Sequence, residues 1–377
     1  MRSRTLAIAK KEGREILRDP ITLGIAILLP LLMMFLFAYA ITLDVKEIRL
    51  AVLDLDRSSE SREYLAAFFR SGYFTLGAVA GNVREVEDLL DRGAVRVALV
   101  IPPDFSRRLG QGLPAEVQTL VDGSFANTAI MALNYVAAID EAQNARLQSR
   151  SLSRRFGTPQ VGPAVRAEPR VRYNPELRSA NYIVPGLFAV ILMAFPPMLT
   201  ALAVVREKER GSIQQIFTSP VRGWEFIGGK MIPYAGIAFL EMVLLLVAGV
   251  LWFRAPVRGS IPLLLLLSLL YVLCTVGIGL LISTRTRSQL VAILLSIVLT
   301  LMPSFLFSGF LFPIATMPPF FQGYSHLFPA RHFMEIARGI ALKGIGLPHL
   351  WLNALLLLLY GSAVMALACL RFKKKVG

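Results

Sequence analysis

Long runs of apolar residues, separated by short charged segments, dominate the chain. Six of these runs reach the length of about 20 residues that an α-helix needs to cross a bilayer. A backbone in lipid must satisfy its own hydrogen bonds, so each run is predicted to be helical. The six predicted spans are residues 21–43, 181–205, 226–253, 261–283, 288–311 and 349–370.

The first 20 residues have a different pattern. Apolar and small residues recur at helical spacing, and basic residues lie largely on the other faces, which is typical of an amphipathic helix on a membrane surface. Asp19-Pro20 is expected to end this helix before the first span. A cleavable signal peptide is the alternative, because residues 38–40 (AYA) resemble a cleavage site. The apolar run is long for a signal peptide, so residues 1–20 are predicted to be an interfacial helix.

Residues 44–179 contain no run of membrane length. Short strand-like runs alternate there with amphipathic stretches, an order that favours a small α/β domain with a partly parallel sheet. The predicted strands are 48–53, 73–76, 95–101 and 117–121, and the predicted helices are 58–70, 82–91, 102–109 and 124–155. Residues 156–179 are rich in proline and are predicted to be a linker. The fold class is therefore an α-helical polytopic membrane protein with six transmembrane helices and an inserted α/β extracytoplasmic domain.

Composition and charge indicate how the predicted spans are oriented in the membrane. Of the 377 residues, 55% are hydrophobic and 17% charged, whereas soluble domains carry about 25% charged residues. Residues 44–179 hold 18 basic and 17 acidic residues, so nearly all of the net charge of +15 lies in short segments beside the spans. This bias marks cytoplasmic loops and suits anionic lipids, so no nucleic-acid partner is expected. It places residues 1–20 and the basic tail 372–377 in the cytoplasm and residues 44–179 outside.

Residues of the types that usually act in catalysis or metal binding are scarce. Segment 44–179 has no His or Cys, both cysteines (Cys274 and Cys369) lie in apolar runs, and the three histidines are scattered. No catalytic, cofactor-binding or metal site is therefore predicted. Residues 223–231 come nearest to a phosphate-binding loop, but they have an extra glycine and lack Ser or Thr after Lys230.

Glu241 lies in the middle of the third predicted span. An ionisable residue at that depth is a functional hypothesis by default, with the carboxylate facing a cavity or a polar partner. The alternative is a buried structural hydrogen bond to a neighbouring helix. The sequence leaves both open.

The connection between spans two and three, residues 206–225, carries the most informative motif. Residues 209–211 read E-R-G, and Gln215 and Ser219-Pro220 follow. This segment closely resembles the inside-loop motif of type-2 ABC exporter permeases, approximately E-R-G-T-x-E-Q-L-x-x-[ST]-P. Gln214 stands where the motif has a glutamate, so the charge pairing of that position is lost here.

Two further segments are similar to the drug-export branch of the same family. One is the N-terminal stretch 11–20, which looks like an interfacial entry helix. The other is the last outer segment, 312–348, which is predicted to be re-entrant and to act as an outer gate. Its matching motifs are Ser308-Gly309, Phe312-Pro313, Met317-Pro318, Pro329-Ala330, Arg338-Gly339 and residues 342–344.

The resemblance implies a transporter permease with no enzyme activity of its own. Residues 206–225 would be the coupling loop, in a region 180–371 that contains spans two to six. The coupling residues implied are Glu207, Glu209, Arg210, Gly211, Gln215 and Pro220. The outer-gate residues implied are Pro313, Pro318, Pro329, Arg338 and Lys343.

The partners and location are also implied by the resemblance. An ABC ATPase subunit would bind ATP and magnesium, so no cofactor is expected in this chain, and a second permease, identical or homologous, would complete a dimer. A periplasmic adaptor is a further candidate partner. The location would be the bacterial inner membrane, with a drug or lipid as the substrate class. The competing hypothesis is a membrane-anchored sensor or scaffold whose outside domain binds a ligand.

Overall fold

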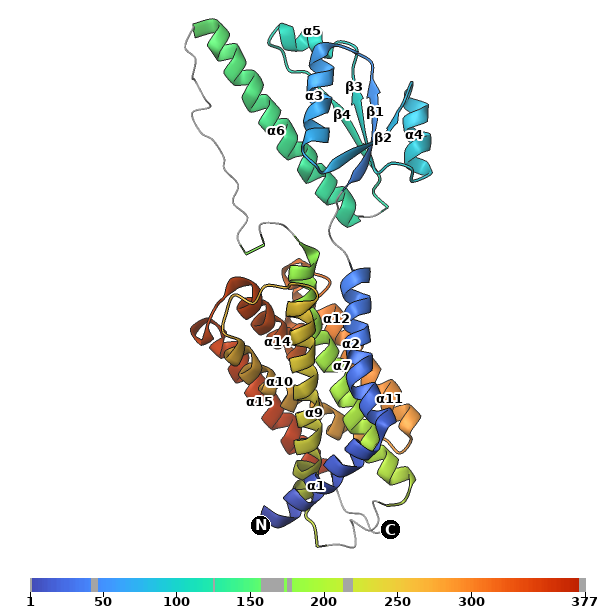
Figure 1. Ribbon diagram of the computed structural model, residues 1–377, viewed down its shortest axis with the longest axis vertical. Helices are drawn as coiled ribbons and strands as arrows, with labels where there is room; N and C mark the ends of the chain where they lie inside the picture. Colours follow the sequence, from blue (N-terminus) through green and yellow to red (C-terminus); the bar gives the residue numbers. More distant parts are fainter. Residues whose placement is uncertain are drawn as a thin grey trace. The chain divides into compact units, whose positions relative to one another are not determined.

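The computed structural model describes residues 2–41, 47–124, 126–156, 173–174, 178–212 and 220–372. The chain divides into two compact units, Leu43–Val171 and Met1–Thr42 with Arg172–Gly377 (Figure 1). Most of the predicted linker 156–179 lies outside the described residues. Each unit has its own hydrophobic core.

The second unit is a bundle of long helices. Six of its helices are long and apolar enough to cross a membrane, which confirms the predicted number of spans. They are α2 (Pro20–Ala40), α7 (Ser179–Glu209), α9 (Gly223–Leu251), α10 (Ile261–Arg285), the pair α11 (Gln289–Ser296) and α12 (Met302–Phe307), and α15 (Leu347–Arg371).

The fifth span is interrupted, although the sequence analysis treated residues 288–311 as one helix. A π-helical turn, η1 (Ile297–Leu301), separates α11 from α12, and helix ends at Phe307. Pro303 explains the change, because proline cannot donate a backbone hydrogen bond to the preceding turn. The wider turn accommodates the missing donor.

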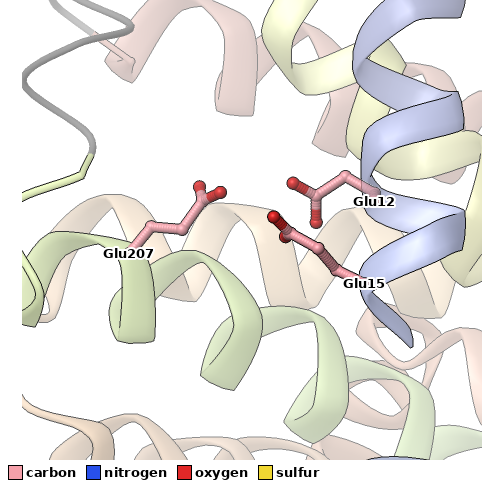
Figure 2. Close-up of side chains that lie close together, drawn as sticks. All are labelled: Glu12, Glu15 and Glu207. Carbon is pink, nitrogen blue, oxygen red and sulfur yellow. The ribbon is translucent and has the colours of Figure 1, made fainter. Parts of the chain in front are cut away.

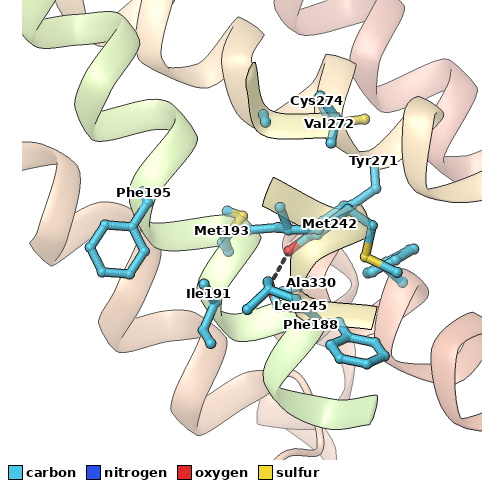
Figure 3. Packing of buried hydrophobic residues seen from close by; sticks show 14 of the residues in the cluster. Phe188, Ile191, Met193, Phe195, Met242, Leu245, Tyr271, Val272, Cys274 and Ala330 are labelled. Carbon is cyan, nitrogen blue, oxygen red and sulfur yellow. Dashed lines mark hydrogen bonds between the residues drawn. The ribbon is translucent and has the colours of Figure 1, made fainter. Parts of the chain in front are cut away.

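Helix α7 is the centre of the bundle, since 83% of its most apolar stretch is buried within the unit. Side chains of α7, α9 and α10 meet there in one core (Figure 3). The hydroxyl of Tyr271 on α10 donates a hydrogen bond over 2.7 Å to the carbonyl oxygen of Ala189 on α7. Further along, Gly279 of α10 lies so close to the backbone of Pro197 that a Cβ atom there would overlap it. The two helices are therefore in backbone contact.

The N-terminal helix α1 (Arg2–Arg18) lies against α9 at one end of the bundle (Figure 1). Ala9 and Ile16 are buried, whereas Leu6 and Leu17 are exposed. A Cβ atom on Gly229 of α9 would lie 2.7 Å from Ile8, so α1 packs closely here. The predicted break at Asp19-Pro20 is present, because Asp19 is the N-cap of α2.

The segment between α12 and α15 consists of short helices. They are η2 (Ile314–Thr316), α13 (Pro319–Tyr324), η3 (Ser325–Leu327), α14 (Pro329–Arg338) and the π turn η4 (Gly339–Lys343). Gly344 follows η4 with a φ of 68°, a left-handed conformation that glycine adopts without strain. Helix α14 packs against α7, α10 and α15, which fixes this segment to the bundle.

The other unit contains a four-stranded sheet of order β2-β1-β3-β4. Strand β1 (Ile48–Asp54) runs parallel to β2 (Phe74–Val79) and β3 (Val97–Ile101), and β4 (Gln118–Val121) is antiparallel to β3. The helices of this unit are α3 (Ser59–Arg70), α4 (Val83–Asp91), α5 (Phe105–Gly110) and α6 (Ala126–Phe156). Strand β2 starts one residue later and ends three residues later than the predicted 73–76.

Both faces of this sheet are covered by apolar side chains. Leu50, Val52 and Leu99 belong to one core cluster, and Ala51 and Ala98 belong to the other, as expected for alternating strand residues. A parallel sheet buried on both faces needs helices on each side. The strands therefore read as nearly continuous apolar runs in the sequence.

Candidate functional site

The predicted coupling loop is largely helical at its two ends. The sequence analysis assigned residues 206–225 to a connection, but α7 continues to Glu209 and α9 begins at Gly223. The reason is local: Arg206 to Glu209 are all good helix formers, and the first helix-ending residue is Gly211. Gly211 has a φ of 74°, the left-handed conformation common just after a helix.

We call Arg206, Glu207, Lys208 and Glu209 the terminal quartet of α7. Successive helical residues point about 100° apart, so four in a row face four directions. Nη1 of Arg206 lies 2.9 Å from Oδ2 of Asp19, at the junction of α1 and α2. Oε1 of Glu207 accepts a hydrogen bond over 2.7 Å from Nζ of Lys11 on α1.

The other two members of the terminal quartet reach the turn between α10 and α11. Nζ of Lys208 donates to the carbonyl oxygens of Ser283 and Thr286, the latter over 3.2 Å. The carboxylate of Glu209 accepts from the backbone N–H of Gln289 over 2.7 Å and from the side-chain amide of the same residue. The end of α7 is thus bonded to the ends of α1, α2, α10 and α11 at once.

A buried ion-pair cluster shares Glu207 with the terminal quartet, and we define it as Glu12, Glu207 and Lys230 together with Lys11, whose side chain is half-exposed at its edge. Nζ of Lys230 on α9 lies 2.8 Å from Oε1 of Glu12 and 2.9 Å from Oε2 of Glu207. These contacts are ion pairs by distance but lack good hydrogen-bond angles. The Lys230 side chain is 0% exposed and that of Glu12 4% exposed. Breaking such a pair leaves an uncompensated charge in a low-dielectric interior.

The carboxylates of this region converge. Glu12 and Glu15 project from α1, and Glu207 projects from α7 toward them (Figure 2). One oxygen of each lies within 4.8 Å of the others, a spacing that a metal ion could bridge. Ammonium groups already occupy the space, because Lys11 contacts all three carboxylates and Lys230 contacts two. The arrangement is therefore a network of ion pairs.

The surroundings shift the proton affinities of the groups outside the spans. Burial raises the pKa of Glu12, and the nearby charge of Lys230 opposes this rise. Burial lowers the pKa of Lys11, but the hydrogen bond and charge of Glu207 outweigh burial, so its pKa is raised. The hydroxyl and backbone N–H of Thr22, together with Arg206, lower the pKa of Asp19 to about 2. Lys11 and Asp19 are accordingly ionised at neutral pH.

The segment that comes nearest to a phosphate-binding loop has another role. Residues 223–231 form the first turns of α9, and Lys230 is held by two carboxylates. A phosphate-binding loop needs exposed backbone N–H groups and a lysine free to contact phosphate. This segment offers neither.

The remaining coupling residues have different positions. Arg210 caps the end of α7 and is exposed. The carbonyl oxygen of Pro220 accepts a hydrogen bond over 2.8 Å from Nη1 of Arg4 on α1. Gln215 lies outside the described residues. The chain on both sides of the undescribed stretch 213–219 is therefore bonded to α1.

At the other end of the bundle, Arg338 links three segments. Its Nη1 donates to the hydroxyl of Tyr182 on α7 over 2.9 Å and to the carbonyl oxygen of Gly309 over 2.7 Å. Its guanidinium carbon lies 3.6 Å from the centre of the Tyr182 ring. Gly186 allows this approach, since a Cβ atom there would lie 2.9 Å from Nη2 of Arg338.

The other implied gate residues do not contact Arg338 through side-chain bonds in the described structure. Pro313 and Pro318 precede short helices, and their carbonyl oxygens accept hydrogen bonds from Thr316 and Phe321. Pro329 is the first residue of α14, where proline is favoured. Lys343 is exposed at the end of η4. Of the five, Arg338 alone makes side-chain hydrogen bonds across this end of the bundle within the described residues.

Glu241 is buried in α9, with 2% of its surface exposed. Neither carboxylate oxygen has a hydrogen-bond partner within the described part of the chain. It follows Lys230 by about three helical turns on nearly the same face. The structure therefore contains a carboxyl group in mid-span without a local structural partner.

The sequence analysis did not predict which residues pair in the buried ion-pair cluster. Lys11, Glu12, Asp19, Arg206 and Lys230 were not proposed as site residues. One signal was available: Lys230 lies in the predicted apolar run that starts near residue 226, where an unpaired lysine is costly. Its carboxylate partners could not be chosen from the sequence, because they lie far away along the chain.

Comparisons with known proteins give matches over nearly the whole chain. A family model described as "ABC-2 family transporter protein" matches residues 20–370. The chain is 31% identical over 375 residues to the probable multidrug ABC transporter permease YbhS of Escherichia coli strain K12, covering 99% of this chain and 97% of that one. It is 31% identical to the permease YbhR of the same organism, covering 99% of both chains. It is also 29% identical over 334 residues to the inner membrane transport permease YhhJ of that organism, covering 87% of this chain and 86% of that one.

Proposed function

The chain belongs to the ABC-2 family of transporter proteins, and on this premise we propose that it exports a hydrophobic or amphipathic substrate, such as a drug or lipid, from the cytoplasm or inner leaflet. It is a multi-pass permease of the bacterial inner membrane. A separate ATPase subunit would supply the energy and bind ATP and magnesium. A second permease, identical or homologous, would complete the transporter, and a periplasmic adaptor would extend it outward.

The terminal quartet of α7 is the observation that carries the proposal. It is bonded to the ends of α1, α2, α10 and α11. A push on the connection that follows α7 would therefore be transmitted to several helices together. Ionic contacts of this kind are short and directional. A displacement of the end of α7 therefore either moves the bonded helices with it or breaks the bonds.

The proposed orientation places this end of the bundle in the cytoplasm. The basic residues of α1 and of the connection after α7 favour the cytoplasmic side. An ATPase subunit would dock on residues 206–225, with Glu209 and Arg210 at the exposed surface. The unit Leu43–Val171 would then lie outside, and the Arg338 contacts would close the outer end of the permease.

The test is to reconstitute the permease with its ATPase subunit and to measure ATP hydrolysis with and without permease. Glu209→Ala and Arg210→Ala are expected to lower the stimulation by about 5- to 150-fold, the usual range of coupling free energies. Membrane insertion should be unchanged, since both side chains are exposed. Arg14→Ala is the control, because Arg14 is an exposed cation of α1 outside the coupling set. Full stimulation in both variants would remove this connection from its proposed role.

A further inference from the structure

A cavity of about 750 Å³ lies between α1, α2, α7 and α9, beside the terminal quartet of α7. This volume is within the range of about 300–1,000 Å³ that is typical of sites for small molecules. Its lining is both apolar and charged. Such a surface suits a molecule with an apolar part and an ionic part.

The apolar side of the cavity is formed mainly by α7 and α1. Leu199, Leu202 and Ala203 line it from α7, and Ile16 lines it from α1. Leu199 and Ile16 are 6% and 5% exposed, so they form a packed wall, whereas Leu202 and Ala203 are half-buried. An alkyl chain against these side chains would remove apolar surface from water at about 25 cal/mol per Å².

The charged side of the cavity, counted with Lys230, has an excess of cations. Its four carboxylates, Glu12, Glu15, Asp19 and Glu207, are all engaged by Lys11, Lys230 or Arg206. Arg18 and Arg210 also line the cavity, and neither makes an ion pair or side-chain hydrogen bond with the residues that the structure describes. Four cations and four carboxylates line the cavity, and Lys230, which pairs with Glu12 and Glu207 without lining the cavity, brings the local sum to one positive charge.

The two arginines flank one ion pair. Arg18 directly precedes Asp19, and Arg210 follows Arg206 by about one helical turn. The Asp19–Arg206 contact of 2.9 Å fixes these two segments to each other. Each arginine is therefore close along its helix to one member of this ion pair, and both line the charged side of the cavity.

We propose that this cavity binds an anionic phospholipid of the cytoplasmic leaflet. Its phosphate lies between Arg18 and Arg210, and an acyl chain lies against Leu199, Leu202 and Ile16. Arginine binds phosphate through two parallel N–H groups, and a phosphodiester carries the single negative charge that balances the excess. The assignment of the leaflet rests on the orientation given under the proposed function. A bound lipid would bridge α1 and α7 next to the buried ion-pair cluster.

The purified full-length permease, in detergent and without an ATPase, is titrated with phosphatidylglycerol, phosphatidylcholine, glycerol 1-phosphate and inorganic phosphate. Binding is followed by native mass spectrometry. We expect phosphatidylglycerol to bind at least about tenfold more tightly than the other three, the effect of one charge-assisted contact. Equal binding of phosphatidylcholine, or equal binding of either soluble phosphate, would overturn the proposal.

Variants separate the site from general attraction to a basic helix. Arg18→Gln is expected to lower the preference for phosphatidylglycerol about tenfold, and Arg18→Lys should retain most of it. Leu202→Trp, which fills the apolar side, is expected to reduce binding of both lipids. Arg14→Gln is the matched control, since Arg14 is an exposed arginine of α1 that does not line the cavity.

Each variant result decides the matter. A preference unchanged by Arg18→Gln, lipid binding unchanged by Leu202→Trp, or a preference lowered as much by Arg14→Gln would show surface attraction only and refute the site. The readout needs no ATPase subunit, so failure here leaves the proposed transport function standing. Full ATPase stimulation in the Glu209 and Arg210 variants would likewise leave the result of the lipid measurement unaffected.

Discussion

Arg338 and Tyr182 are joined in two ways at once: Nη1 of the arginine donates to the tyrosine hydroxyl over 2.9 Å, and its guanidinium carbon lies 3.6 Å from the centre of the ring. No carboxylate of the described residues pairs with this half-buried cation. The ring face and three carbonyl oxygens, those of Tyr182, Gly309 and Phe310, take that role. Such a contact is strong enough to fix α14 to α7 and yet can separate without stranding a buried carboxylate.

Loss of this contact is expected to loosen the outer end of the bundle. Arg338→Met removes the donor at 2.7 Å from the Gly309 carbonyl oxygen and leaves that oxygen only the longer hydrogen bond of 3.4 Å from the Tyr182 hydroxyl, so we expect a loss of about 1–3 kcal/mol in stability. Arg338→Lys should restore only part of it, because lysine lacks the planar fork that stacks on the ring. Thermal unfolding in detergent measures the effect, with Lys343→Met as the exposed control. Equal unfolding temperatures for native protein and Arg338→Met would contradict the linkage.

Removal of Lys230 is expected to be among the most destabilising single changes. Lys230→Met leaves Glu12 and Glu207 facing each other in a buried site, at a cost of about 3–5 kcal/mol. We expect the lower end of this range, because Lys11 still contacts both carboxylates. The double variant Glu207→Gln with Lys230→Met should recover part of the loss, and Lys10→Met, an exposed lysine of α1, should have little effect. If Lys10→Met and Lys230→Met unfold alike, the buried cluster does not stabilise the bundle.

The close approach of α10 and α7 makes a specific prediction for glycine. Gly279→Ala places a methyl group on the backbone of Pro197, so the helices must separate, and we expect a cost of about 1–3 kcal/mol or more. Gly236 in α9 has no atom within 4 Å of the position that an added methyl group would take, so Gly236→Ala is the matched control and should be neutral or slightly stabilising. A thermal unfolding comparison of the two variants would disprove the close packing if Gly279→Ala were the more stable.

Replacement of Glu241 is expected to change stability and transport activity in opposite directions. Its buried carboxyl group has no hydrogen-bond partner in the described structure. Replacing it by methionine removes a desolvated polar group, so we expect a gain of about 1–3 kcal/mol in stability. We expect transport to fall in the same variant, because ionisable groups at mid-span usually serve function. Unfolding temperature and substrate efflux are both measured, and efflux at the native level would assign Glu241 no part in transport.

The spans were predictable because the rule behind them is local. A run of about 20 apolar residues has only one stable form in lipid, whatever lies elsewhere in the chain. The break at Asp19-Pro20 was predictable for the same reason, since the conformation of a residue before proline is restricted by its neighbour. The interruption of the fifth span at Ile297–Leu301 was not predicted, although Pro303 was the available signal.

The sites were harder to predict because their bonds are between distant segments. Residues 206–209 were assigned to the connection between spans two and three, and the sequence contains no sign that each side chain has a fixed partner. Lys230 pairs with Glu12 and Glu207, and Arg338 pairs with Tyr182 and Gly309. Which cation meets which acceptor depends on how the helices are arranged in space, and that arrangement has no local signature.

The bonds made by the four side chains of the terminal quartet also constrain how the gene can vary. Inserting or deleting one residue of α7 between Pro197 and Arg206 would rotate the quartet by about 100° and shift it by about 1.5 Å. Each of its four side chains would then face the neighbour's former direction. The length of this half of α7 is therefore expected to be invariant, with insertions and deletions tolerated only outside it.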